Sequence, residues 1–220
     1  MMTPARDTGP HRGAALYQSG AAAEEATGAL ILLHGRGGSA QDILSLGEAL
    51  GLKSVSMFAP QAAGDTWYPN SFLAPIASNE PWLSSALNTV AGTIDQCVEL
   101  GFAHKRIAIA GFSQGACLAC EFVARHPERY AALVAFTGGL IGPLGAELHH
   151  AGSLEGTPIL LSSGDPDMHV PWKRVEETAE QFIAMGAAVT LKKYLVRPHT
   201  IIPEEIEQAH TLLSAVLTAP

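Results

Sequence analysis

The segment Gly111 to Gly115, GFSQG, carries a serine in the pattern G-x-S-x-G, which is typical of an activated nucleophile. The apolar run Ile107 to Ala110 before it favours a short buried strand, and Ala116 to Glu121 after it favours a helix. A strand that turns at once into a helix lifts the hydroxyl of Ser113 out of the turn. The helix start supplies free backbone N–H groups beside it. For the pentapeptide alone, an ordinary strand–helix turn that happens to contain a serine remains the alternative.

A serine nucleophile needs a base, and the base needs an acid that orients it. Around a corner of this kind the chain order is serine, acid, histidine. Among the nine histidines, His199 directly follows the last expected strand and comes after every candidate acid. His169 stands two residues after Asp167 and is expected to frame that loop. Asp165 and Asp167 share the loop, and since Asp165 precedes a proline and suits a turn, Asp167 is preferred while Asp165 stays an alternative.

The glycine-rich segment His34 to Gly38 follows another apolar strand pattern. With the residue after the nucleophile, it would supply the two N–H groups of an oxyanion hole, from Arg36 and Gln114. The segment also fits the dinucleotide pattern G-x-G-x-x-A. However, no acid ends the next strand about 20 residues on, and no Gly-Lys-Ser/Thr follows as in a phosphate loop. The pair His149 and His150 lacks metal-ligand spacing. We therefore expect neither a cofactor nor a metal.

Strand and helix patterns alternate along the whole chain. Strands are expected near 14–19, 29–33, 54–59, 107–110, 132–136, 159–162 and 189–196, and helices near 39–51, 81–101, 116–121, 173–185 and from 203 onward. This order predicts an α/β fold with a mostly parallel central sheet and helices on both faces. Such sheets bind ligands at the carboxyl ends of their strands, where the candidate residues fall. The 137–158 connection is too short for a large cap domain.

Length and composition bound the other possibilities. The 220 residues suit a single domain, 1–220, with 1–12 as a flexible tail. A net charge of −8 argues against nucleic-acid partners and against docking on anionic membranes. The sequence shows no signal-peptide pattern and no apolar run long enough for stable membrane insertion. Its three cysteines form no disulfide framework, which suggests a cytoplasmic protein. The oligomeric state stays open, a homodimer included.

A long loop from Pro60 to Ile76 carries Trp67, Tyr68 and Phe72. We expect these aromatic side chains to form an apolar substrate-binding wall beside the serine. The alternative, strongest for Trp67, is that the rings anchor the loop to the core. An open cleft with a modest apolar wall predicts a preference for short to medium acyl chains.

Several motifs occur together and in a characteristic order: LILLHGRGG, APQ followed by the TWY loop, GFSQGACLA, SSGDPDMHVP and RPHTIIPEEI. From Leu30 to Ile206 the chain resembles the phospholipase/carboxylesterase family, which includes acyl-protein thioesterases, within the α/β-hydrolase fold. The resemblance places the acid, which precedes x-x-Val-Pro, on Asp167. It places the base on His199 and the second oxyanion donor, which follows His-Gly, on Arg36.

The resemblance implies a serine carboxylesterase that cleaves small carboxylic esters or thioesters through an acyl-enzyme. Two other functions stay open. One is an acyl-protein thioesterase or lysophospholipase that deacylates lipidated substrates. The other is a non-catalytic binding protein with a hydrolase fold.

Overall fold

The computed structural model describes residues 9–218, so residues 1–8 of the expected tail lie outside the described residues. Within the described range, the strands are β1 (Leu16–Gly20), β2 (Gly28–Leu33), β3 (Val55–Pro60), β4 (Ile107–Phe112), β5 (Ala132–Phe136), β6 (Pro158–Asp165) and β7 (Ala188–Leu195). The α-helices are α1 (Ala40–Ala49), α2 (Trp82–Glu99), α3 (Gln114–Arg125), α4 (Trp172–Ala184) and α5 (Pro203–Leu217). Short 3-10 turns are η1 (Ala63–Asp65), η2 (Ile76–Asn79) and η3 (His104–Arg106).

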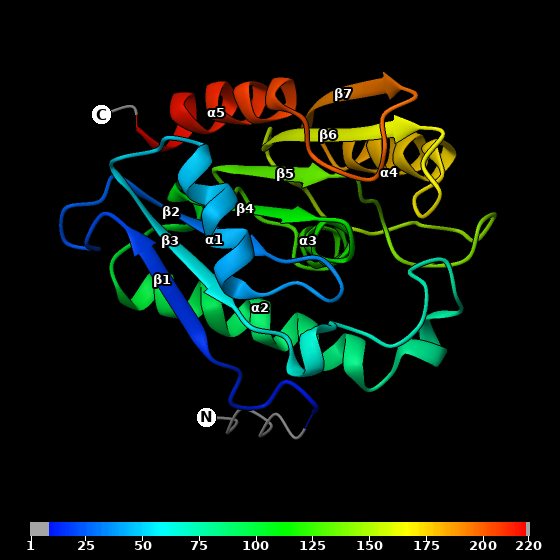
Figure 1. The fold of residues 1–220 in the computed structure, drawn as a ribbon, viewed down its shortest axis with the longest axis horizontal. Coiled ribbons are helices and arrows are strands. Elements are labelled where there is room, and N and C mark those ends of the chain that lie inside the picture. Colours follow the sequence, from blue (N-terminus) through cyan, green and yellow to red (C-terminus); the bar gives the residue numbers. More distant parts are fainter. Residues whose placement is uncertain (1–8, 219–220) are drawn as a thin grey trace.

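The strands form one twisted sheet in the order β1-β3-β2-β4-β5-β6-β7 (Figure 1). The edge strand β1 pairs antiparallel with β3, and all other neighbouring pairs are parallel. Nearly every residue of β2, β3, β4 and β5 is buried, as parallel strands covered on both faces require. The predicted α/β class, with a mostly parallel sheet and helices on both faces, is confirmed.

Alternation along the strands builds two separate apolar layers, because successive side chains point to opposite faces. On β2, Ile31 and Leu33 pack with the buried faces of α2, α3 and α4. Leu30 and Leu32 pack with α1 and α5 on the other face. Full burial of one such side chain contributes about 1.5–3 kcal/mol, so these two layers hold the helices on the sheet.

A topological switch point lies between β2 and β4. After β2 the chain forms α1 on one face and then β3 on one side, whereas after β4 it forms α3 on the opposite face and then β5 on the other side. The chain segments that leave β2 and β4 therefore diverge and open a crevice at the carboxyl ends of these strands. The segment 137–157 contains neither helix nor strand, so no cap domain is inserted there.

The expectation of a flexible tail over 1–12 is wrong for its described end. His11 is only 2% exposed, and its ring packs against Trp67 and Trp82. Its Nε2 lies 2.9 Å from the carbonyl oxygen of Trp67, and its Nδ1 accepts the backbone N–H of Ala63 at 3.0 Å. These partners lie more than fifty residues away in the chain, so no local pattern indicated them.

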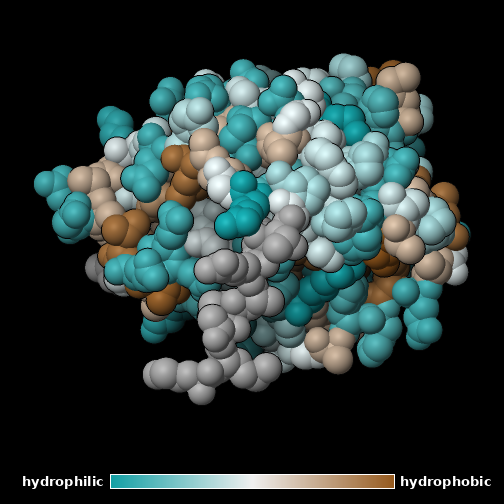
Figure 2. All heavy atoms as spheres, turned by 90° about the horizontal axis from the view of Figure 1, so that it is seen from below, coloured by the Kyte–Doolittle hydropathy of each residue, from teal (hydrophilic) through white to brown (hydrophobic). Residues whose placement is uncertain are grey.

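The face that carries α2 is mostly hydrophilic, with apolar residues in small separate groups (Figure 2). Among the described residues, no helix combines the length and the apolar character needed to cross a membrane.

Candidate active site

The corner between β4 and α3 consists of one residue, Ser113. Its φ of 53° and ψ of −117° lie in a region that serine rarely adopts and that concentrates at functional sites. A Cβ on Gly115 would lie 2.1 Å from the carbonyl oxygen of Leu33, and one on Gly111 would lie 2.5 Å from the backbone of Gly115. Both glycines are thus needed for the strand and helix to approach this closely, which explains the G-x-S-x-G pattern.

Ser113, His199 and Asp167 are linked by hydrogen bonds. The Nε2 atom of His199 lies 2.8 Å from Ser113 Oγ, and its Nδ1 lies 2.9 Å from Asp167 Oδ2. Asp167 Oδ1 also accepts the backbone N–H groups of His169 and Val170, each at 2.9 Å. Burial by itself raises the pKa of Asp167, but these hydrogen bonds to its charged form outweigh burial, and the pKa lies below its usual value. A carboxylate that stays ionised is suited to hold an imidazole in one orientation.

The alternative acid, Asp165, points elsewhere. It ends β6, and its Oδ2 pairs with Lys193 Nζ of β7 at 3.1 Å on a partly exposed surface. The structure therefore brings Asp167, and not Asp165, to His199.

A buried ion pair holds the loop that carries His199. Arg197 Nε lies 3.5 Å from Glu205 Oε2, with both side chains at most 3% exposed. Arg197 also donates to Thr137 Oγ1 at 2.6 Å, and Glu205 accepts the hydroxyl of Ser162 at 2.6 Å. The network ties the chain around His199 to Thr137, directly after β5, and to Ser162 within β6. No pattern in the sequence indicates this network, because its members lie on segments that are far apart in the chain.

The two predicted oxyanion donors line the same cleft as Ser113. Gln114 begins α3, and Arg36 follows β2 across the switch point. Among residues 9–218, neither backbone N–H donates to a protein acceptor. Both amides thus meet a requirement for binding developing negative charge.

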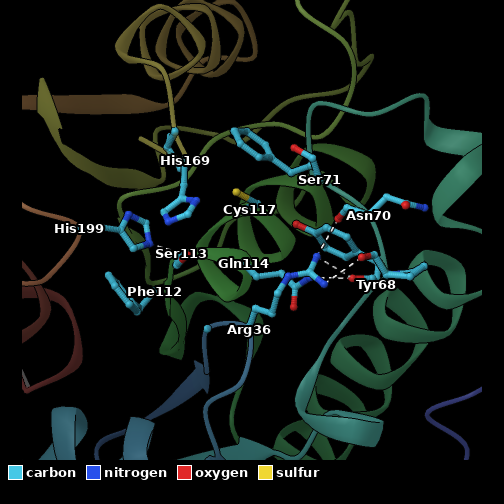
Figure 3. A pocket seen from close by; sticks show the side chains of 14 residues that line it. Arg36, Tyr68, Asn70, Ser71, Phe112, Ser113, Gln114, Cys117, His169 and His199 are labelled. Carbon is cyan, nitrogen blue, oxygen red and sulfur yellow. Dashed lines mark hydrogen bonds between the residues drawn. The ribbon is translucent and has the colours of Figure 1, made fainter. Parts of the chain in front are cut away.

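The side chains of these two residues have a second task that the sequence did not indicate. Gln114 Oε1 accepts the N–H of Trp67 at 2.9 Å, and its Nε2 donates to the carbonyl of Tyr68 at 2.8 Å. The guanidinium of Arg36 donates to three successive carbonyls, from Tyr68 to Asn70, at 2.7–2.9 Å (Figure 3). The loop from Pro60 to Ile76, the aromatic loop, is therefore hydrogen-bonded both to the start of α3 and to the segment that follows β2.

We expect Arg36→Met to loosen the aromatic loop while it leaves the backbone N–H of residue 36 in place. Loss of charge-assisted hydrogen bonds at a partly exposed site should raise KM and lower kcat/KM about 3- to 10-fold. Steady-state kinetics on one ester measures this effect. Arg36→Lys is the control that keeps the charge without the planar fork, and it should recover part of the loss. An unchanged KM in Arg36→Met would remove the loop-positioning role.

His34, the first residue of the glycine-rich segment, makes two hydrogen bonds through its buried ring. Its Nδ1 lies 2.8 Å from the carbonyl oxygen of Gly35, and its Nε2 accepts the backbone N–H of Ala62 at 3.1 Å. This pattern requires a neutral ring with the proton on Nδ1. Burial lowers the pKa of His34 below its ordinary value of 6.5.

Stability should therefore depend on pH through His34. Below pH 6.5 the unfolded chain binds a proton that folded His34 excludes, so the free energy of unfolding falls as the pH drops. In His34→Gln, whose amide can replace both hydrogen bonds, this fall should be smaller, by at most about 1.4 kcal/mol per pH unit. Urea unfolding at about pH 7.5 and about pH 5 measures the difference. Identical pH dependence in both proteins would contradict the assignment.

The cleft around Ser113 has a volume of about 440 Å³. Its apolar lining includes Tyr68, Phe72, Cys117 and Val170. The prediction that Trp67 lines the cleft is wrong. Trp67 is completely buried, and its indole N–H donates to the carbonyl of His34 at 2.8 Å, so the ring turns into the core and anchors the loop.

Cys117 is the other nucleophile type in the cleft. Burial raises the pKa of its thiol to about 12, so it stays protonated and unreactive at neutral pH. Among residues 9–218, no cluster of three or more His, Cys, Asp or Glu side chains is suited to a metal ion.

The model of the Phospholipase/Carboxylesterase family matches residues 19–217. Acyl-protein thioesterase 1 of Eremothecium gossypii is 28% identical over 219 residues, which cover 90% of this chain and 92% of that protein. Acyl-protein thioesterase 1 of Saccharomyces cerevisiae is 29% identical over 138 residues, and the match spans only 61% of this chain and 60% of that protein.

The crystal structure of a phospholipase/carboxylesterase from Dyadobacter fermentans superposes with a TM-score of 0.88 at 41% identity, covering 91% of this chain and 96% of that one. The family match, the shared fold and the serine corner identify an ester-hydrolysing enzyme with the α/β-hydrolase fold. The chain belongs to the phospholipase/carboxylesterase family.

Proposed function

We propose that the chain is a serine carboxylesterase for short to medium acyl esters or thioesters, with Ser113 as nucleophile, His199 as base and Asp167 as its orienting acid. The observation that carries the proposal is the unbroken hydrogen-bond path from Asp167 through His199 to Ser113 Oγ, with distances of 2.9 and 2.8 Å. This path ends at the switch point of the sheet, where α/β proteins bind ligands.

In the first half of the reaction, Ser113 Oγ attacks the carbonyl carbon while His199 Nε2 takes the hydroxyl proton. The backbone N–H groups of Arg36 and Gln114 bind the oxyanion of the tetrahedral intermediate. The bond to the leaving oxygen or sulfur then breaks, and His199 returns its proton to that atom. The alcohol or thiol departs, and the acyl group remains on Ser113.

In the second half, water replaces the alcohol. His199 removes a proton from the water as it attacks the acyl-enzyme, and the oxyanion again lies at the same two N–H groups. Collapse breaks the bond to Ser113 Oγ, which recovers its proton from His199. Asp167 stays ionised throughout and stabilises the imidazolium that forms twice in each cycle.

Substrate size follows from the cleft. A volume of about 440 Å³ is in the lower part of the range for small-molecule sites. Its apolar wall is modest, since Tyr68 and Phe72 contribute to it and Trp67 does not. The absence of any helix in the segment 137–157 leaves the described cleft without a cap that would enclose a long chain.

We expect kcat/KM to be highest for short to medium acyl groups. The test is a series of p-nitrophenyl esters from acetate through octanoate to palmitate, with matching acyl thioesters. Activity should pass through a maximum and fall for the longest chains, because the cleft lacks apolar surface for further methylenes.

A second candidate is deacylation of lipidated proteins or lysophospholipids. The relatives named acyl-protein thioesterase 1 favour it. A steady rise of kcat/KM out to palmitate, or a strong preference for thioesters, would support this candidate against the first. A homodimer and a cytoplasmic location stay predictions.

A further inference from the structure

A second groove, of about 300 Å³, adjoins the catalytic cleft. We call it the α1 groove, and its lining residues are His34, Gly35, Arg36, Gly38, Asp42, Ile43, Leu46, Phe112 and Ile201. Gly35, Arg36 and Phe112 also line the cleft around Ser113, so the two hollows share a common border. The mechanism above does not use the α1 groove.

The shared border lies beside the reacting atoms. The ring of Phe112 packs against the ring of His199, with 5.2 Å between centroids. A Cβ on Gly35 would lie 3.3 Å from Phe112 Cδ1 and 3.5 Å from Ser113 Cβ, so the lack of a side chain at Gly35 leaves more room at this border. In Figure 3, Phe112 and His199 lie on one side of Ser113, and Tyr68 lies on the other.

The chemistry of the α1 groove favours an apolar group. Ile43, Leu46, Phe112 and Ile201 supply aliphatic and aromatic surface. At its rim, the Asp42 carboxylate already bonds with Ser39 at the start of α1, and its negative charge disfavours anionic groups.

Stereochemistry assigns the two hollows different parts of the substrate. In the tetrahedral intermediate on Ser113, the leaving oxygen must lie near His199 Nε2 to receive the proton. Two residues of the α1 groove are neighbours of His199, since the ring of Phe112 packs against its ring and Ile201 follows it by two positions in the chain. The acyl group, which points away from the leaving oxygen, is left with the surface formed by Tyr68, Phe72 and Cys117.

We propose that the α1 groove binds the apolar alcohol part of the ester substrate, such as a small aliphatic or aromatic alcohol. This assignment rests on the proposed esterase function. It predicts that the groove contributes to acylation only, because the alcohol has left before the acyl-enzyme is hydrolysed.

The test uses the substitution Leu46→Trp, which places a larger side chain in the groove. Leu46 is a half-buried residue of α1. Substrates are methyl, butyl and benzyl butyrate, which share one acyl group, and methyl esters of increasing acyl length. Relative to methyl butyrate, Leu46→Trp should lower kcat/KM for butyl and benzyl butyrate about tenfold or more, since loss of a few buried methylenes has this effect. The acyl series should keep its wild-type profile, and the hydrolysis rate of the butyryl-enzyme should not change.

Ser45→Trp is the matched control, because Ser45 is exposed on the same helix and lies outside the groove lining. It should leave both series as in the wild type. An effect of Leu46→Trp on the acyl series, equal effects on both series, or none would overturn the assignment. In those cases turnover of methyl butyrate and labelling of Ser113 by a fluorophosphonate would still support the esterase function. If the wild-type protein neither hydrolysed methyl butyrate nor took up the fluorophosphonate label, the esterase function itself would be refuted.

Discussion

Ser113→Ala should lower kcat for an activated ester by at least about four orders of magnitude. Without the hydroxyl no acyl-enzyme forms, and only binding and the oxyanion hole remain to accelerate attack by water. The backbone at this corner already has a φ of 53°, and alanine has no greater difficulty there than serine, so the fold should persist. Steady-state kinetics with urea unfolding as the folding check gives the answer.

Ser71→Ala is the matched control for this experiment. It removes another hydroxyl from the same cleft, one that accepts the backbone N–H of Leu73 at 3.2 Å. Its kcat should stay within about threefold of the wild type. Near-normal turnover by Ser113→Ala would place the nucleophile elsewhere, although the thiol of Cys117, with its pKa of about 12, is a poor substitute.

Asp167→Asn should lower kcat/KM about 10³- to 10⁴-fold, because an amide cannot hold the imidazole of His199 in the required tautomer or stabilise its charged form. The distances from His199 Nδ1 to the two carboxylate oxygens, 2.9 and 3.1 Å, show how directly the two groups are coupled.

Asp165→Asn provides the comparison. This change breaks an exposed ion pair with Lys193, which contributes about 0–1 kcal/mol to stability, and should alter kcat/KM only a few-fold. The variants are to be assayed across a pH range after their folding is checked. A larger loss in Asp165→Asn than in Asp167→Asn would exchange the roles of the two carboxylates.

Most of the architecture could be predicted because its causes are local. The alternation of apolar runs and amphipathic segments specified every strand and α-helix of the described chain to within a few residues. The glycines at 111 and 115 carried a steric requirement that the structure makes explicit. Chain order and the glycine-rich loop then placed Arg36, Ser113 and His199 after the carboxyl ends of β2, β4 and β7, at the same edge of the sheet.

What could not be predicted depends on contacts between distant residues. The burial of Trp67 follows from a hydrogen bond to His34 and from contact with His11, and no pattern within the loop distinguishes it from Tyr68. The fork of Arg36 reaches carbonyls more than thirty positions later in the chain. The sequence likewise does not indicate that Arg197 pairs with Glu205 in a buried network.

The proposed mechanism depends most on Ser113 being the nucleophile that His199 activates. The most direct measurement is reaction of the wild-type protein with a fluorophosphonate, followed by peptide mapping of the modified residue. We expect one label per chain, on Ser113, and strongly reduced labelling when His199 is replaced by alanine. A label on another residue, or ester hydrolysis by a protein that takes up no label, would contradict it.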